Sequence, residues 1–220
     1  MKYNKEIINF DKNKYNFKKM VQNVFEVEDL EKIHEDYSYH SGLCTMQDNS
    51  NSIYHKRFYD KLRSGWSEFT DLYEGLIKNV IFPRYESGCV FQTTPTLRIH
   101  LVKNWATPEF HCDSQPGYNH PVGEKNYLLP LTECYGNNSL WVETEPNKGD
   151  YHPMRLNYGQ VIEWDGNVLR HGNKINDTEK TRVSLDFRVL PKKYYKPKKN
   201  EQPSGTRKMR FIVGEYYKEL

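Results

Sequence analysis

The stretch that decides the fold spans residues 181–189 and reads TRVSLDFRV. Apolar and polar residues alternate in it, so on an extended chain the two sets of side chains point to opposite faces. The apolar set is Val183, Leu185, Phe187 and Val189, and the polar set is Arg182, Ser184, Asp186 and Arg188. The pattern predicts a β-strand over 181–190, with one face in a hydrophobic core and charged groups on the other.

Further short strands are expected on the N-terminal side of this one. Residues 96–101, TLRIHL, show the same alternation, with Arg98 and His100 on the polar face. Other candidate strands lie at 109–113, 126–131, 139–144 and 159–164, separated by turn residues. Strands and helices do not alternate here, which argues against a doubly wound parallel sheet. We therefore expect a mainly β fold with flanking helices (α+β), a curled double sheet braced by helices.

The first half of the chain is expected to be largely helical. Residues 66–81 repeat apolar residues at helical spacing, and Pro83 ends the pattern. A second helix is expected over 26–40, a loop over 41–55 and a surface segment over 1–25. The predicted organisation is one domain over 1–190, with a helical part at 1–85 and a β core at 86–190. A basic C-terminal tail at 191–220 follows.

Composition excludes several classes of protein. The 220 residues are 36% hydrophobic and 14% aromatic, which is typical of a folded domain. No apolar run is long enough to span a membrane. The net charge of +3 comes from residues 191–210, which hold eight Lys or Arg and one Glu, and this segment is the only hint of a nucleic-acid partner. Four cysteines without a CxxC pair and an N-terminus without an apolar signal favour reduced thiols and a cytoplasmic location.

Three residues form a candidate metal site. His111 and Asp113 point to the same side of a predicted strand, while Cys112 points away. His171 follows 58 residues after Asp113, and Gly172 next to it lets the backbone approach a crowded site. Two imidazoles and one carboxylate are the ligand set of non-haem Fe(II) oxygenases, which leave one side of the ion open.

A candidate anion clamp lies eleven residues after His171. Arg182 on a rigid strand, with the Ser184 hydroxyl two residues on, suits bidentate binding of a carboxylate. A salt bridge from Arg182 to Asp186 or to another acid is the alternative.

These three parts together resemble the Fe(II)- and 2-oxoglutarate-dependent oxygenases. The chain looks closest to the phytanoyl-CoA-dioxygenase-like branch, which includes small streptomycin-biosynthesis-type proteins. The resemblance covers about Pro95 to Leu190 and rests on these segments: 96–100, 110–113, 126–132, 138–143, 159–166, His171-Gly172 and 181–184.

The resemblance implies a double-stranded β-helix (a jelly roll, cupin-like) over 86–190. It implies Fe(II) held by His111, Asp113 and His171, which are thereby also the catalytic residues, and 2-oxoglutarate held through its distal carboxylate by Arg182. Ser184 fits the Arg-x-Ser pattern of the penicillin-synthase-like branch better, and Asp113 argues against the halogenating members. The implied reaction uses O₂ and 2-oxoglutarate to oxidise an unactivated C–H of a small molecule, by default through hydroxylation, and releases succinate and CO₂.

Further site residues are less specific. Asn126 or Tyr127 are candidates for hydrogen bonds to 2-oxoglutarate. Arg98 and His100 are candidates for substrate binding, and His120 for a lid beside the metal strand. Trp141 and Trp164 are expected to be core aromatic residues.

Two other readings use the same features. A zinc hydrolase with the same three ligands would need a general base, for which Glu143 and Glu163 are the candidates. A jelly roll can also be a sugar-binding module without catalysis.

Overall fold

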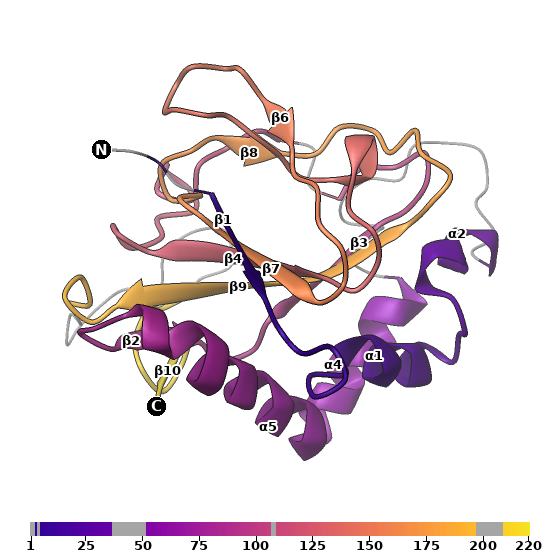
Figure 1. Ribbon diagram of the computed structural model, residues 1–220, viewed down its shortest axis with the longest axis horizontal. Coiled ribbons are helices and arrows are strands. Elements are labelled where there is room, and N and C mark those ends of the chain that lie inside the picture. The colour runs from indigo at the N-terminus through magenta and orange to yellow at the C-terminus, as the bar shows by residue number, and fades with distance from the viewer. Residues whose placement is uncertain (1–2, 4, 37–51, 107–108, 197–208) are drawn as a thin grey trace.

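The computed structural model describes residues 3, 5–36, 52–106, 109–196 and 209–220. Two antiparallel sheets face each other, and helices cover the outer side of the larger one (Figure 1). The larger sheet has the order β1 (Glu6–Asn9), β7 (Gln160–Trp164), β4 (Lys125–Pro130), β9 (Arg182–Pro191), β2 (Cys89–Gln92) and β10 (Tyr217–Glu219), and β3 (Thr96–His100) also pairs with β9. The smaller sheet has the order β6 (His152–Pro153), β5 (Trp141–Val142) and β8 (His171–Gly172).

Strand β9 organises the larger sheet. It pairs with β4 along one edge and with β3 and β2 along the other. The predicted alternation is confirmed: Val183, Leu185 and Phe187 are buried in the core that β9 shares with the helices. The polar residues of β9 face the opposite way, toward the smaller sheet, where Arg182, Asp186 and Arg188 line a cavity together with His171.

The helices bury apolar stripes against the outer face of this sheet. The long ones are α1 (Phe17–Phe25), α4 (Ile53–Arg63) and α5 (Ser67–Leu76). Short helical turns lie at η1 (Leu30–Lys32), α2 (Ile33–Asp36), η2 (Ile77–Ile81), η3 (Phe82–Arg84) and η4 (Gly136–Asn138). Phe25 packs in a tilted arrangement against Tyr54, and Phe17 meets Phe69 edge to face. Such apolar contacts fix the helices on the sheet.

The helix predicted over 66–81 is confirmed as α5 and η2, and Pro83 lies in the turn that follows. The surface segment predicted for 1–25 is wrong, because Phe17, Val21 and Phe25 recur every four residues and form a fully buried stripe of α1. The helix predicted for 26–40 is shorter, covering 30–36 among the described residues. Glu26, with φ of 61°, ends α1. The predicted loop 41–55 lies mostly outside the described residues, and α4 begins at Ile53.

A second core fills the space between the two sheets. Leu128 and Ile162 from the larger sheet meet Leu140 and Val142 from the side of the smaller one. The observed fold is therefore mainly antiparallel β with flanking helices, as predicted.

The described C-terminal residues are part of the larger sheet. β10 pairs with β2, and Phe211 and Tyr217 pack with Val90 and Leu190. Most of the basic segment, residues 197–208, lies outside the described part of the chain. Among the described residues, no helix has the length and apolar character needed to cross a membrane.

His55 near the start of α4 makes the stability of this fold depend on pH. Burial, and then the charge of Arg98, lower the pKa of His55 from 6.5 to about 4. Between these values the unfolded chain binds more protons, so the free energy of unfolding decreases as the pH falls from 6.5 toward 4. Between pH 7.5 and 4.5, we expect the free energy of unfolding of His55→Gln to fall by about 2–3 kcal/mol less than that of the unmodified protein, as measured by urea unfolding. Equal pH slopes in the two proteins would contradict the assignment.

Candidate metal centre

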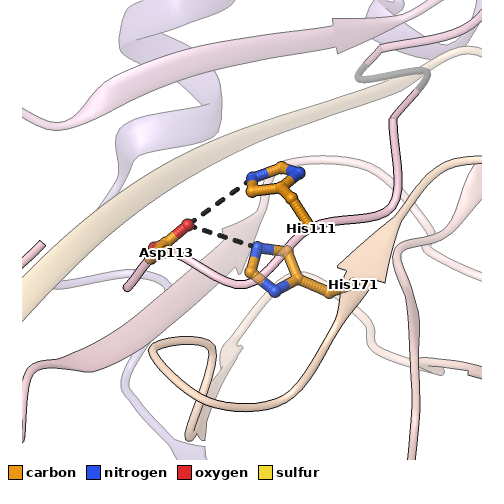
Figure 2. A group of neighbouring side chains, drawn as sticks. All are labelled: His111, Asp113 and His171. Carbon is orange, nitrogen blue, oxygen red and sulfur yellow. Dashed lines mark ion pairs between the residues drawn. The ribbon is translucent and has the colours of Figure 1, made fainter. Parts of the chain in front are cut away.

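Three side chains from two distant segments converge between the sheets (Figure 2). His111 and His171 form a β-bridge, in which each backbone N–H donates to the carbonyl oxygen of the other at 3.0 and 2.8 Å. The backbone N–H of Asp113 donates to the carbonyl oxygen of Gly166, five residues before His171. These bonds tie the 111–113 segment to the end of β7 and the start of β8, so both histidines and Asp113 face one point. All three residues are buried.

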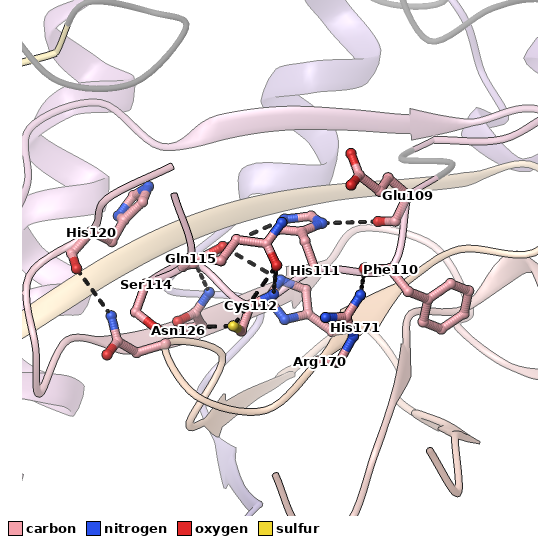
Figure 3. Close-up of polar contacts among 12 residues, drawn as sticks. Glu109, Phe110, His111, Cys112, Ser114, Gln115, His120, Asn126, Arg170 and His171 are labelled. Atoms are coloured by element: carbon pink, nitrogen blue, oxygen red, sulfur yellow. Dashed lines mark hydrogen bonds and ion pairs between the residues drawn. The ribbon is translucent and has the colours of Figure 1, made fainter. Parts of the chain in front are cut away.

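The three donor atoms are aimed at one another. The Nε2 atoms of His111 and His171 lie 3.5 and 3.6 Å from Oδ1 of Asp113. Nδ1–H of His111 donates to the carbonyl oxygen of Glu109 at 2.9 Å (Figure 3). Nδ1–H of His171 donates to the carbonyl oxygen of Leu169 at 3.0 Å. These bonds select the tautomer in which Nε2 carries the lone pair, the form that binds a metal ion.

The second oxygen of Asp113 is held from the side of the larger sheet. Oδ2 accepts from Asn126 Nδ2 at 2.7 Å and from Nε and Nη2 of Arg188 at 3.2 and 3.0 Å. Burial by itself would raise the pKa of Asp113, but the charge of Arg188 holds this pKa well below its usual value. Asp113 is therefore a carboxylate with Oδ1 directed at the histidines.

The donor set fits a divalent metal ion. Burial lowers the pKa of His171 from 6.5 to about 4, although Asp113 opposes the shift, so its imidazole is neutral at pH 7. Donor atoms of His111, Asp113 and His171 lie within 4.8 Å of one another. Two neutral imidazoles and one carboxylate on one side of an ion leave its other side open, as in non-haem Fe(II) sites.

A neighbouring group of possible ligands is already neutralised. His120 Nδ1 lies 2.6 Å from Glu124 Oε2, and the hydroxyl of Tyr217 donates to the other oxygen of Glu124. The charge of Arg188 acts on both Glu124 and Asp113. The hydrogen bonds of His120 and Tyr217 to Glu124 link β10 to the segment that carries Asp113.

A cavity adjoins the three ligands and is lined by Arg98, Leu128, Trp164, Arg182, Asp186 and Arg188 among others. Arg182 is buried, with Nε donating to the carbonyl oxygen of Asn138 and Nη1 to the Ser184 hydroxyl, both at 2.7 Å. Asp186 pairs with Arg98 at 3.2 Å and not with Arg182, so the cavity keeps an excess of positive charge.

The other residues singled out in the sequence lie as follows. Asn126 holds Asp113 and Arg98 lines the cavity. The hydroxyl of Tyr127 contacts Glu163 and Tyr85, and its ring stacks on Phe187 on the helix side of the sheet. His100 is fully buried, and both its ring nitrogens contact carbonyl oxygens, those of Asn138 and Asn104. The ring of His120 packs in a tilted arrangement against Phe211, and His120 is not among the residues that line the cavity.

Sequence reasoning did not assign a role to Arg188. The alternation in 181–189 places its side chain on the same face as Arg182, and this was the available signal. Its partner could not be found this way, because Asp113 comes from a segment 75 residues away.

The two proposed general bases of a zinc hydrolase are occupied elsewhere. Glu143 is fully buried and accepts from the backbone N–H groups of Asn147, Gly149 and Arg170, so it organises a loop. Glu163 accepts from Tyr127 and pairs with Arg84 on the helix side. Neither carboxylate is among the groups lining the cavity.

Gly172 is required by close packing. A Cβ atom at this position would lie 2.9 Å from Cγ and 3.1 Å from Cα of Phe110. We expect Gly172→Ala to lower the free energy of unfolding by about 1–3 kcal/mol and to weaken metal binding, because relief of the overlap displaces His171 from His111. Urea unfolding and metal titration measure the two effects.

Gly75→Ala is the matched control, since its Cβ meets only Tyr15 at 3.7 Å inside α5. This helical substitution should be neutral or stabilise by about 0.5–1 kcal/mol. Equal stability of Gly172→Ala and the unmodified protein would contradict the packing argument.

Comparison with known proteins gives one relative in sequence and several in structure. The chain is 34% identical over 198 residues to the streptomycin biosynthesis protein StrG of Streptomyces griseus, covering 90% of this chain and 89% of StrG. The solved structure of CytC3 with Fe(II) and alpha-ketoglutarate has a TM-score of 0.53 at 12% identity, over 93% of this chain and 80% of CytC3. The epimerase SnoN, in complex with Fe³⁺, alpha ketoglutarate and nogalamycin RO, has a TM-score of 0.48 at 11% identity, over 99% and 94%. No family model matches the chain.

Proposed function

The chain belongs to the streptomycin-biosynthesis-type branch of the Fe(II)- and 2-oxoglutarate-dependent oxygenases, and from this premise we propose that it oxidises a small molecule with 2-oxoglutarate and O₂. The reaction releases succinate and CO₂, and we assign hydroxylation of an unactivated C–H bond as its outcome. The two facing sheets correspond in this proposal to the two halves of a double-stranded β-helix (Figure 1).

The observation that carries the proposal is the convergence of three metal donors with fixed orientation. His111 and His171 present Nε2, because their Nδ1–H groups are bound to carbonyl oxygens, and Asp113 presents Oδ1. Orientation by a partner on the other ring nitrogen is the arrangement of histidines that bind metals. We assign these three side chains as the Fe(II) ligands.

Other residues of the chain position the ligands and the oxoacid. Arg188 and Asn126 hold Asp113 as a carboxylate. Arg182 binds the distal carboxylate of 2-oxoglutarate, and Ser184 orients its guanidinium. An iron ion held by these ligands would supply the oxidising chemistry. The apolar walls at Leu128 and Leu140 keep bulk water from this cavity.

Arg98 is the residue we assign to the substrate. It lines the cavity, is partly exposed, and pairs with Asp186, whose other oxygen accepts from Ser184. A polar or anionic group of the substrate can exchange with Asp186 for this guanidinium. His100 and His120 are not assigned to the substrate, because both ring nitrogens of His100 and Nδ1 of His120 have partners within the protein.

An anaerobic titration tests the proposal. Fe(II) and 2-oxoglutarate added together should give a visible metal-to-ligand charge-transfer band, and admission of O₂ should then release succinate. Absence of the band in protein that retains zinc would favour hydrolysis instead. Bound iron without succinate above the level of a His111→Ala variant would favour a binding module.

A further inference from the structure

Trp164 lies at the end of β7. Its indole ring packs in the core between the sheets and also contacts His171 of the metal centre. It is 3% exposed, and its indole ring meets the His171 ring edge to face at 6.0 Å. It also packs with the apolar residues between the sheets, which accounts for the ring but not for its N–H.

The indole N–H of Trp164 is left unpaired by the residues that the structure describes. Nε1 is buried and has no hydrogen-bond acceptor among the described residues. Indole Nε1–H is only a donor, and a buried donor without an acceptor is costly, so such groups usually have a partner in the working form of a protein. The missing partner must be an acceptor.

The cavity beside Trp164 defines what kind of acceptor fits. Its charged lining consists of Arg98, Arg182 and Arg188 against Asp186, and Leu128 and Leu140 supply apolar walls. A cavity with excess cationic groups favours an anionic ligand with oxygen acceptors. Carboxylate oxygens meet both requirements.

Strand register decides which end of such a ligand Trp164 would meet. Trp164 is opposite Asn126 on β4, and Asn126 is opposite Arg188 on β9. Arg182 lies six residues away along β9. Trp164 is thus at the metal end of the cavity, beside His171, and Arg182 is at the other end.

We propose that the indole N–H of Trp164 binds the carboxylate at the 2-oxo end of 2-oxoglutarate. This inference rests on the proposed function, because it needs the oxoacid in this cavity. Trp164 is then a binding residue that orients the oxoacid end, while Arg182 holds the distal carboxylate.

The test is a calorimetric titration of 2-oxoglutarate into the full chain loaded with Mn²⁺. Trp164→Phe keeps an aromatic ring but removes the donor, and it should weaken binding about ten-fold or more, as expected for a hydrogen bond to a charged group. Trp141→Phe is the matched control, because Trp141 Nε1 is also buried without an acceptor but its ring lies under Lys174, outside the cavity lining. It should change binding by less than about two-fold.

A second variant separates the hydrogen bond from packing. Benzothienylalanine at position 164 replaces the N–H by sulfur with nearly the same shape, and it should reproduce the loss seen with Trp164→Phe. Mn²⁺ affinity, measured separately, should stay unchanged in both variants. If the unmodified protein binds 2-oxoglutarate and both variants bind it equally well, this inference is overturned and the proposed function stands. If the unmodified protein binds no 2-oxoglutarate, both are overturned.

Discussion

His171→Ala is expected to abolish the stabilisation of this protein by metal. With a free Mn²⁺ or Fe(II) concentration about 1,000 times Kd, binding to the folded state alone stabilises by roughly 4 kcal/mol. For a chain of this length that corresponds to an increase in Tm of about 8–16 °C. The variant removes one of the three metal ligands. Loss of a residue that only hydrogen-bonds to a ligand commonly weakens metal affinity by about 10–100-fold, so loss of the ligand itself should have a larger effect. We expect more than 100-fold weaker binding and no measurable succinate release.

His152→Ala provides the control for this experiment. His152 is exposed on β6 and has no part in the triad, so the variant should keep the full metal-dependent increase in Tm. Thermal unfolding with and without metal, under anaerobic conditions for Fe(II), measures both proteins. A metal-dependent increase that survives in His171→Ala would show that the ion binds elsewhere.

Arg182→Met is expected to have the second large effect, on affinity for 2-oxoglutarate. The guanidinium is fully buried, and Nε and Nη1 are engaged by Asn138 and Ser184, so it is fixed before any ligand arrives. Removal of one partner of a buried charge pair commonly costs about 2–5 kcal/mol, which is roughly 30- to 5,000-fold in Kd. Calorimetric titration of the Mn²⁺-loaded protein measures this loss.

Metal affinity distinguishes this effect from general damage to the site. Arg182 makes none of its hydrogen bonds to the three ligands, so Mn²⁺ should bind Arg182→Met nearly as well as the unmodified chain. Arg155→Met changes an exposed arginine outside the cavity lining and should leave both affinities unchanged. An Arg182→Met variant that binds 2-oxoglutarate normally would remove Arg182 from the site.

Sequence patterns predicted those parts of the site that depend on one segment at a time. Period-two alternation placed Arg182, Ser184, Asp186 and Arg188 on one face of β9, and the structure has them there. The same argument placed His111 and Asp113 on one side, and their side chains do converge, but the predicted strand over 109–113 is wrong, since only an isolated bridge at His111 forms there. Alternation could not predict which face of the sheet the Tyr127 side chain occupies. That face depends on the register of β4 against β9, which pairs Tyr127 with Phe187. The buried stripe of α1 was missed because lysines and asparagines separate its aromatic residues.

Residue order alone is enough to predict the chemical types and the local direction of the side chains: an imidazole and a carboxylate two residues apart, a later histidine beside a glycine, and an arginine on an alternating strand. Local geometry follows from neighbouring residues, so a short segment contains it. Tertiary contacts bring His171 to face Asp113, pair Arg188 with the same carboxylate, and leave the buried Trp164 N–H without an acceptor among the described residues. Those relations join segments far apart in the chain, and they are set by strand register and by the packing of one sheet on the other.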